Sequence, residues 1–373
     1  MKILNVVGAR PNLVKMAPII REMDRWPDIE WMLVHTGQHY DARLSDLFFR
    51  QLNIPEPNVN LDVGSGSQSW QTAEIIKRIE PVLVEHCPDV VLVVGDVSST
   101  LAASLVAVKA GIPIAHVESG LRSFDRTMPE EINRILTDAV AEYLFVTEDD
   151  AITNLLAEGR PRERIYFVGN VMIDALRMFL PVARNSNVGE VLGLTNGNGL
   201  KPFGILTLHR ASNVDSPQNL SHLLNVISDV TEDLPIVFPV HPRTQSMMEK
   251  LERASWPNIR LTPPLGYLDF LCLMSQAKLV LTDSGGIQEE TTALGVPCLT
   301  LRENTERPVT VAQGTNELVG FDSGKIRRAV ELVFMGSWKT GTVPQLWDGR
   351  AAERIIEILR SNPPYRNMKG HSA

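Results

Sequence analysis

Short apolar runs alternate with longer stretches of helical periodicity along most of the chain, and this alternation constrains the fold more than any other feature. Apolar side chains in the longer stretches recur every three or four residues, as in Ile76, Ile79 and Leu83. Strands that alternate with helices form a parallel sheet with helices on both faces, so the pattern predicts an α/β fold. The expected strands are residues 3–7, 31–36, 90–94, 113–117, 143–147 and 164–168, then 203–208, 236–240, 258–261, 278–282 and 297–301.

A polar, glycine-rich stretch at residues 185–201 separates the two series of strands and is typical of a linker. A chain of 373 residues also exceeds what one hydrophobic core usually serves. We therefore expect two Rossmann-like, doubly wound domains, over residues 1–170 and 185–350, and a final segment at 351–373. Ligands bind such sheets at the carboxyl ends of the strands, so two domains that face each other would form a cleft.

Composition and charge exclude several function classes. The formal net charge of −8 argues against a general affinity for nucleic acid or an anionic membrane, because both bind a basic face. No apolar stretch is long enough to span a membrane, and Arg10 and Lys15 interrupt the opening apolar run before it could act as a signal sequence. Cys87, Cys272 and Cys298 show no C-x-x-C spacing, which indicates reduced thiols rather than zinc ligands. We expect a soluble, cytoplasmic protein that binds no metal, nucleic acid or membrane.

The phrase G-A-R-P-N-L-V-K at residues 8–15 follows the first expected strand and opens a helix. Free N–H groups at a helix N-terminus bind anions, and Arg10 and Lys15 could direct positive charge at a phosphate. The alternative is that both cations are solvated at the surface. The phrase lacks the G-x-G-x-x-G pattern of dinucleotide-binding domains, so it predicts a phosphate contact rather than a redox cofactor site.

Three carboxylates, Asp96, Glu118 and Glu130, follow expected strands of the first half. The carboxyl ends of parallel strands meet at one edge, where burial and mutual repulsion can fit a carboxyl group for proton transfer. The structural alternative is that Asp96 and Glu130 cap helices and that Glu118 pairs with Arg122. Next to an anion site, the three together favour acid/base catalysis.

Two histidines of the second half, His209 and His241, end corresponding expected strands. A single histidine is usually structural, but two at corresponding strand ends favour a diphosphate contact or a general acid. Neither lies in a metal-binding motif.

The phrase D-S-G-G-I-Q-E-E at residues 283–290 directly follows another expected strand. Its small residues, Ser284, Gly285 and Gly286, would donate main-chain N–H groups to a diphosphate. A turn later, Glu290 could accept the two hydroxyls of a ribose. The alternative is a glycine turn before an ordinary capped helix.

The chain as a whole resembles one family over nearly its full length. The shared phrases are G-A-R-P at 8–11, K-M-A-P at 15–18, T-G-Q-H at 36–39, G-D at 95–96, H-V-E-S-G-L-R at 116–122, P-E-E-I-N-R at 129–134, D-S-G-G-I-Q-E-E at 283–290 and T-E-R-P at 305–308. In this order they resemble the non-hydrolysing UDP-N-acetylglucosamine 2-epimerases.

The resemblance implies a fold like that of the B-type glycosyltransferases, with the last helix, near residues 351–359, crossing back to the first domain. It implies a reaction in which UDP is eliminated to leave a glycal with a C1–C2 double bond and adds back after protonation on the other face. Neither a metal nor NAD is implied. A homodimer, a role in cell-envelope polysaccharide synthesis and closure of the two domains on UDP are further expectations.

The resemblance also assigns roles to residues. The acid/base and catalytic candidates are Asp96, Glu118, Glu130 and His209. The expected substrate contacts are Arg10, Lys15, Ser284, Gly285, Gly286, Glu290 and Arg307. A second UDP-sugar or phosphate contact is expected at Gln38, His39, Arg210 and His241.

The chain departs from the common family pattern at a few positions. Asn12 replaces a common glutamate, Val97 a common threonine, and Ala211 with Ser212 a common Arg-Glu pair, which leaves allosteric activation by a second UDP-sugar open. Phrases at residues 38–41, 47–49 and 207–211 are also similar to the branch that epimerises UDP-2,3-diacetamido-glucuronate, the alternative substrate.

Two rival hypotheses stand beside the epimerase. One is a B-type glycosyltransferase, which would share the fold and the diphosphate site. The other is a non-catalytic UDP-sugar sensor.

Overall fold

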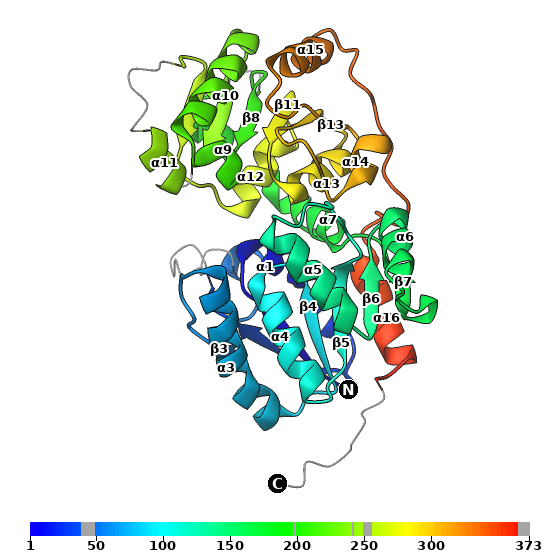
Figure 1. Ribbon diagram of the computed structural model, residues 1–373. Helices are drawn as coiled ribbons and strands as arrows, with labels where there is room; N and C mark the ends of the chain where they lie inside the picture. The colour runs from blue at the N-terminus through cyan, green and yellow to red at the C-terminus, as the bar shows by residue number, and fades with distance from the viewer. Residues whose placement is uncertain (39–48, 197–198, 241, 249–255, 365–373) are drawn as a thin grey trace. The chain divides into compact units, whose positions relative to one another are not determined.

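The computed structural model describes residues 1–38, 49–196, 199–240, 242–248 and 256–364. The chain divides into two compact units (Figure 1). Unit 1 contains Met1–Met178 and the C-terminal stretch from Gln345, and unit 2 is Phe179–Pro344.

The division falls within one helix, α7 (Val171–Ala183), rather than in the stretch 185–201 that we expected to be a linker. That stretch lies in unit 2, where α8 (Val188–Val191) packs against α12 (Tyr267–Met274). The Ser186 hydroxyl also donates a hydrogen bond to Asp269 Oδ1 at 2.6 Å. Buried side chains, among them Leu194, anchor a segment whose composition is otherwise that of a loop.

The described residues of unit 1 form a seven-stranded parallel sheet in the order β3-β2-β1-β4-β5-β6-β7. All six strands expected in this half are present, with bounds within two residues of the prediction; β3 was not expected, because a strand of two residues leaves no apolar run. The strands are β1 (Lys2–Val7), β2 (Glu30–His35), β3 (Val59–Asn60), β4 (Val90–Val94), β5 (Ile114–Ser119), β6 (Tyr143–Val146) and β7 (Ile165–Phe167).

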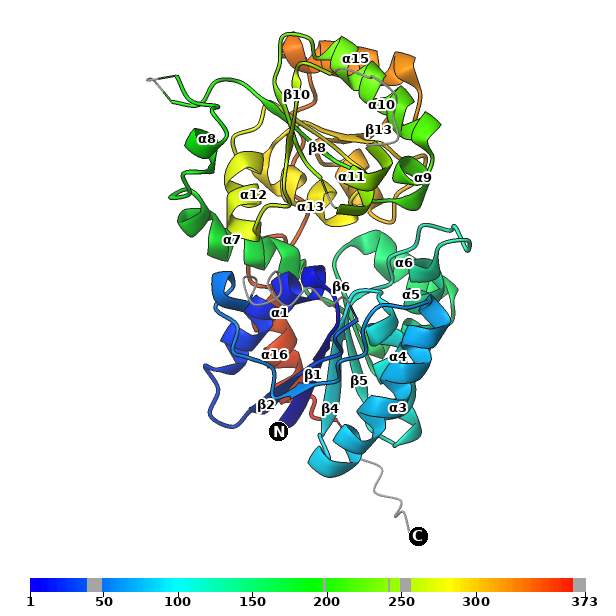
Figure 2. The ribbon, with the colours of Figure 1, turned by 90° about the vertical axis from the view of Figure 1, so that its left-hand side faces the viewer.

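Helices cover both faces of this sheet, as the alternating pattern predicts (Figure 2). On one face α3, α4 and α5 lie side by side, and on the other α1 packs against α16. The helices of unit 1 are α1 (Arg10–Met23), α3 (Gln68–His86), α4 (Ser98–Lys109), α5 (Pro129–Val140), α6 (Asp149–Ala157), η1 (Arg162–Arg164), most of α7, and α16 (Ala351–Ser361). The C-terminal helix is therefore part of the N-terminal fold.

The described residues of unit 2 form a six-stranded parallel sheet in the order β10-β9-β8-β11-β12-β13. The five strands expected here are present with bounds within one residue, and β13 was not expected. The strands are β8 (Gly204–Thr207), β9 (Ile236–Pro239), β10 (Ile259–Thr262), β11 (Leu279–Thr282), β12 (Cys298–Thr300) and β13 (Asn316–Leu318). The helices, besides α8 and α12, are α9 (Ala211–Val214), α10 (Pro217–Val230), α11 (Pro242–Met248), α13 (Gly285–Leu294), α14 (Pro308–Ala312) and α15 (Ser323–Phe334). The expected α/β class with two parallel sheets is confirmed.

Each sheet has a point at which the strand order reverses. In unit 1 it lies between the neighbours β1 and β4, and in unit 2 between β8 and β11. Loops that leave the carboxyl ends of such strands diverge to opposite faces, and the crevice between them is where doubly wound sheets bind ligands. The fold therefore defines one candidate ligand position in each unit. Among the described residues, no helix is long and apolar enough to cross a membrane.

The N-terminus of α16 is held by a buried carboxylate of α7. Asp174 accepts hydrogen bonds from the main-chain N–H groups of Ala351 at 3.1 Å and Ala352 at 2.7 Å. At the other end of α16, the Arg360 guanidinium lies 3.6 Å from the ring centroid of Trp26. These contacts fasten the end of the chain to unit 1.

We expect Asp174→Asn to change how stability depends on pH. Burial raises the pKa of Asp174 from 3.8 to about 6, so the folded state holds a proton that the unfolded state releases. The free energy of unfolding should therefore fall as pH rises through that interval, and the fall should be smaller in the variant. Loss of one acceptor for the helix N-terminus should also cost about 1 kcal/mol at pH 7. Urea unfolding at several pH values measures both effects, with Asp149→Asn at the exposed start of α6 as the control. Equal pH slopes in wild type and Asp174→Asn would contradict the assignment.

Candidate active site

The loop between β1 and α1 is closed tightly against its neighbours. A side chain at Gly8 would place its Cβ 1.9 Å from the Ser99 hydroxyl, so only glycine fits there. The Asn12 carboxamide accepts a hydrogen bond from the Ala9 N–H at 3.0 Å and donates one to the Val94 carbonyl at 2.9 Å. Asn12, one of the departures from the family pattern, thus ties the start of α1 to the end of β4. Arg10, half-buried, is the first residue of that helix.

Lys15 and Glu118 form a buried ion pair at the strand-order reversal of unit 1. The pair lies against Gly95, since a Cβ built there would be 3.2 Å from Lys15 Nζ and 3.6 Å from Glu118 Oε2. The Glu118 backbone is left-handed, with φ of 72°, and the register between β5 and β6 shifts between Val117 and Ser119. Such a bulge redirects a side chain at the end of a strand, and unfavourable backbone angles of this kind gather at functional sites.

Asp96 is held by an arginine that the sequence did not single out. Arg134 of α5, itself buried, donates from Nε to Asp96 Oδ2 at 3.2 Å and also binds this oxygen through its Nη2. The Asn133 carboxamide donates to the Asp96 carbonyl at 2.9 Å. Both the backbone and the carboxylate of Asp96 are therefore fixed by the first turns of α5.

Adjacent glutamates of α5 have opposite surroundings. Glu131 is buried and accepts hydrogen bonds from the main-chain N–H groups of Ser123 and Phe124, each at 2.9 Å, and from Arg134 at 2.7 Å. Glu130 is half-buried and makes no hydrogen bond or ion pair with any residue that the structure describes. Glu131 therefore holds the preceding loop, whereas the Glu130 carboxylate can meet a ligand.

The purely structural roles that the sequence allowed for these acids are wrong. The N-caps of α4 and α5 are Val97 and Met128, so neither Asp96 nor Glu130 caps a helix. Arg122 does not pair with Glu118; it binds Asp138 at 2.8 Å and Glu158 at 2.7 Å.

A buried aspartate, Asp283, organises the corresponding edge of unit 2. Its carboxylate accepts hydrogen bonds from the main-chain N–H groups of His209 at 3.0 Å and Arg210 at 2.9 Å, and from Asn213 Nδ2 at 2.8 Å. The Nδ1 atom of His209 lies 2.6 Å from the same carboxylate. Burial raises the pKa of Asp283, but the hydrogen bond and charge of His209 outweigh burial, so the pKa is lowered overall. The His209 ring, more than half exposed, is oriented by this contact at the end of β8.

The N-terminus of α13 follows immediately and is open to an anion. Ser284 is the N-cap but makes no capping hydrogen bond with its side chain, and the first turn of the helix carries no acidic residue. Ser284, Gly285 and Gly286 are partly exposed. A Cβ at Gly285 would lie 2.4 Å from an Arg307 nitrogen, so a larger residue would displace that guanidinium. Main-chain N–H groups and a cation therefore meet at one point.

Arg307 is part of a buried ionic network rather than an isolated cation. Its guanidinium lies 2.6 Å from Glu306 and 2.8 Å from Glu289. Glu306 also pairs with Arg302 at 2.8 Å and with Arg210 at 3.7 Å. Arginines and glutamates thus alternate beside the N-terminus of α13.

Glu290, the expected ribose contact, is buried within α13 and bonded to a residue that the sequence did not suggest. The Tyr267 hydroxyl donates to Glu290 Oε1 at 2.9 Å, and the Tyr267 ring makes an edge contact with Phe179. Burial raises the pKa of Glu290 to about 8; the Tyr267 hydrogen bond opposes this rise and the charge of Glu289 adds to it. At neutral pH the carboxyl group is therefore mostly protonated.

The expected second site is described only in part. Gln38 is buried, and its side-chain oxygen accepts a hydrogen bond from the Ser99 hydroxyl at 2.9 Å. Arg210 lies near Glu306 in the network around Arg307. His39 and His241 lie outside the described residues.

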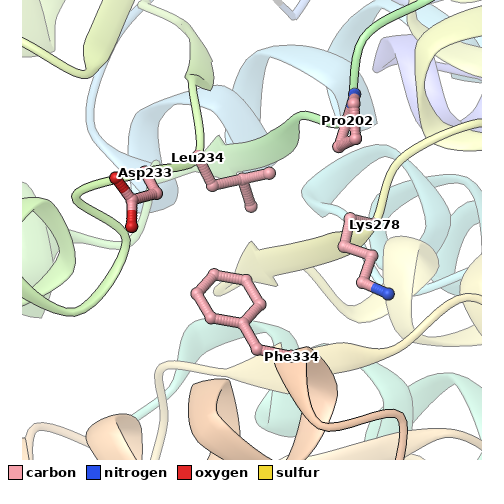
Figure 3. A pocket seen from close by; sticks show the side chains of 5 residues that line it. All are labelled: Pro202, Asp233, Leu234, Lys278 and Phe334. Atoms are coloured by element: carbon pink, nitrogen blue, oxygen red, sulfur yellow. The ribbon is translucent and has the colours of Figure 1, made fainter.

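A hollow on another part of unit 2 is lined by none of the candidate site residues. The hollow in Figure 3, lined by Pro202, Asp233, Leu234, Lys278 and Phe334, lies at the amino ends of β8, β9 and β11, opposite the edge that carries the polar groups. Within the described ranges, no group of three or more His, Cys, Asp or Glu residues could hold a metal ion.

Known proteins share the sequence and the fold of this chain. The profile of the family described as UDP-N-acetylglucosamine 2-epimerase matches residues 21–360. A Methanocaldococcus jannaschii protein of that name is 43% identical over 368 residues, which cover 96% of this chain and 99% of the relative. A Pseudomonas aeruginosa protein named UDP-2,3-diacetamido-2,3-dideoxy-D-glucuronate 2-epimerase is 42% identical, with 96% of this chain and 99% of the relative covered.

Solved structures agree with the sequence comparisons. The Methanocaldococcus jannaschii UDP-GlcNAc 2-epimerase in complex with UDP-GlcNAc and UDP matches with a TM-score of 0.89 at 43% identity, covering 97% of this chain and 100% of that one. The UDP-GlcNAc 2-epimerase of Neisseria meningitidis bound to UDP-GlcNAc matches with a TM-score of 0.88 at 32% identity, over the same shares of the two chains. Profile, sequence and structure coincide over almost the whole length, and the chain therefore belongs to the UDP-N-acetylglucosamine 2-epimerase family.

Proposed function

We propose that this protein epimerises UDP-N-acetylglucosamine at C2 to give UDP-N-acetylmannosamine, without hydrolysis and without a metal or redox cofactor. The observation that carries the proposal is the pair of acids at the strand-order reversal of unit 1, where Glu118 is paired with Lys15 beside Gly95 and Asp96 is held by Arg134. The names of the relatives support the same reaction.

The chemistry requires both an acid/base group and a site for a leaving diphosphate. The C2 proton is not adjacent to a carbonyl, so it becomes acidic only as the C1–O bond breaks and positive charge develops on the sugar. A carboxylate takes that proton, and the bonding electrons of C1–O leave with UDP, which gives a glycal. Protonation of C2 on the opposite face and attack of UDP on C1 then complete the epimerisation.

In this proposal unit 1 supplies proton transfer. Asp96, Glu118 and Glu130 are the acid/base set, and each is held differently: Asp96 by Arg134, Glu118 by Lys15, and Glu130 by no residue that the structure describes. A half-buried carboxylate with its lone pairs available is suited to meet the sugar directly. Arg10 and Lys15 add positive charge for the phosphates.

In the same proposal unit 2 supplies nucleotide binding. The N–H groups of Gly285 and Gly286 stabilise the negative charge that develops on departing UDP. Ser284, whose own N–H donates to the Thr282 hydroxyl at 3.0 Å, and His209 at the end of β8 are further contacts. Glu290 accepts the ribose hydroxyls.

A homodimer and a cytoplasmic role in envelope polysaccharide synthesis belong to the same proposal, since they come with the resemblance. Sedimentation equilibrium of the purified protein measures the oligomeric state directly.

The alternative substrate has specific support, because the Pseudomonas aeruginosa relative named for UDP-2,3-diacetamido-2,3-dideoxy-D-glucuronate is nearly as similar as the archaeal one. We expect incubation with UDP-N-acetylglucosamine in heavy water to give the manno product with deuterium at C2, and the diacetamido-uronate to react more slowly. A faster reaction of the uronate would reassign the substrate. The absence of deuterium from both sugars would refute the epimerase proposal. Release of UDP that requires an added acceptor would indicate a glycosyltransferase.

We expect Asp96→Asn, Glu118→Gln and Glu130→Gln each to lower turnover at least on the order of a hundredfold, while UDP binding changes little. Each variant keeps the shape of the side chain and removes its capacity to transfer a proton. Steady-state kinetics and calorimetric binding of UDP measure the two effects, and Glu142→Gln, an exposed partner of Arg164, is the matched control. Near-normal turnover in all three variants would show that the acid/base assignment is wrong.

We expect binding of UDP near pH 7 to release a proton from Glu290. Its pKa of about 8 leaves the free carboxyl group mostly protonated, whereas two ribose hydroxyls bind best to an ionised carboxylate. Calorimetry in buffers of different ionisation enthalpy should show up to about one proton more released by wild type than by Glu290→Gln, which should also bind UDP more weakly. Glu317→Gln, at an exposed position of β13, should behave as wild type. Equal proton release in wild type and Glu290→Gln would remove Glu290 from the ribose site.

A further inference from the structure

One fully buried carboxylate, Asp138 of α5, binds the chain on both sides of Glu118. Its Oδ1 lies 2.7 Å from His116 Nδ1, two residues before Glu118. Its Oδ2 accepts hydrogen bonds from the Gly120 N–H at 3.0 Å and from the Arg122 guanidinium at 2.8 Å. The segment that carries Glu118 is therefore fixed at both ends by a single side chain.

This double attachment matters because the Glu118 backbone is in an unfavourable conformation. Its φ of 72° is rare for a residue with a side chain, and it persists only where the surroundings impose it. Gly120, with φ of 80°, fits so closely that a Cβ would lie 2.5 Å from the Ala151 carbonyl oxygen. The contacts of His116 and Gly120 with Asp138 therefore restrict the backbone conformations that the intervening residues can adopt.

The contacts of His116 join two parts of the site. Its Nε2 lies 2.9 Å from the Gly95 carbonyl oxygen, which can only accept a hydrogen bond, so this nitrogen is the donor. Its Nδ1 lies 2.7 Å from the Asp138 carboxylate. The pKa of that carboxyl is lowered, because the neighbouring His116 and Arg122 and the hydrogen bond from Gly120 outweigh the effect of burial. The ring therefore links the carbonyl that precedes Asp96 to the carboxylate that holds the Glu118 segment.

The geometry points to Asp138 and His116 as positioning residues of the proposed reaction: the His116 ring holds the Gly95 carbonyl next to Asp96, and Asp138 holds the Glu118 segment, so that one buried pair of side chains sets the positions of both acids. This inference rests on the proposed function for the roles of Asp96 and Glu118. Neither Asp138 nor His116 would touch the substrate, because both side chains are fully buried.

Charged groups surround this pair of side chains. Asp138 faces His116 and Arg122, and the second partner of Arg122 is Glu158 at the end of α6. The ion pair of Lys15 and Glu118 lies beside Gly95. Beyond Gly95, Asp96 is paired with Arg134 of α5.

The first test needs no variant in the catalytic set. Long-range 1H–15N spectra of histidine-labelled wild-type protein should show one ring, identified by its loss in His116→Gln, whose Nε2 carries a hydrogen-bonded proton, because Nε2 faces the Gly95 carbonyl. An Nε2 without a proton would overturn the proposal, because the ring could then not hold that carbonyl.

The second test separates positioning from folding. Asp138→Asn should lower kcat roughly tenfold to a hundredfold and change KM for the UDP-sugar by less than about threefold, since misplacing a catalytic group affects the chemical step rather than binding. In the same variant the 15N signal of His116 Nδ1 should shift, because its carboxylate partner has become an amide. Glu158→Gln, which removes the partly exposed partner of Arg122 and leaves the contacts of His116 in place, is the control and should keep both the wild-type ring spectrum and kcat.

The outcomes distinguish this inference from the proposed function. A folded Asp138→Asn protein with wild-type kcat would overturn the positioning role. If Asp138→Asn does not fold, the wild-type ring spectrum still tests the contact of His116 with Gly95. Wild-type protein that epimerises no UDP-sugar would refute the proposed function, whereas the spectrum would test the contacts of His116 independently.

Discussion

Buried aspartates, Asp138 in unit 1 and Asp283 in unit 2, are the interactions on which both candidate ligand positions depend. Asp283 lies where the strand order of its sheet reverses, whereas Asp138 binds β5 and the loop that follows it, and each carboxylate accepts several hydrogen bonds from these segments. Loops at such an edge have no sheet partners, so their main-chain N–H groups need another acceptor. A carboxylate, with its four lone pairs, can collect donors from chain segments that are distant in sequence.

Burial of these carboxylates would be unfavourable without their partners. The pKa of each aspartate is lowered although burial alone raises it, because a histidine lies against each one and main-chain N–H groups donate to each. A buried charged contact stabilises a fold only weakly, since loss of water offsets much of the attraction. What such contacts do provide is a defined geometry: Asp138 holds the segment of Glu118, and Asp283 orients His209. We therefore assign Asp138 and His116 to positioning, whereas His209 is itself a proposed substrate contact.

Most of the fold could be predicted from the chain alone, because buried parallel strands must be nearly continuous apolar runs. Eleven strands were expected and all are present, whereas the edge strands β3 and β13 contain no such run, because β3 has two residues and β13 is N-E-L. The linker prediction at residues 185–201 was wrong for a related reason. Composition shows that the segment is polar, but it does not show that Val188 and Leu194 find a buried surface in unit 2.

The sequence predicted which residue types form the site and which strands carry them. It did not predict which side chains pair with one another. The polar face of α5, with Glu131, Arg134 and Asp138 at helical spacing and all buried, was a signal that sequence reasoning could have used. Glu130 and Glu131 look equivalent in sequence, yet successive helical residues point about 100° apart, so only one of them is buried against the preceding loop.

The sequence by itself determined the α/β class, nearly all the strands and the placement of acids, histidines and glycines at strand ends, since periodicity and turn chemistry are local properties. Only the tertiary structure decided that Glu118 pairs with Lys15 rather than Arg122, that Arg134 holds Asp96, and that Tyr267 meets Glu290. These pairings join residues from elements far apart in the chain. Their free energy depends on distance and burial, which exist only once the sheets have formed.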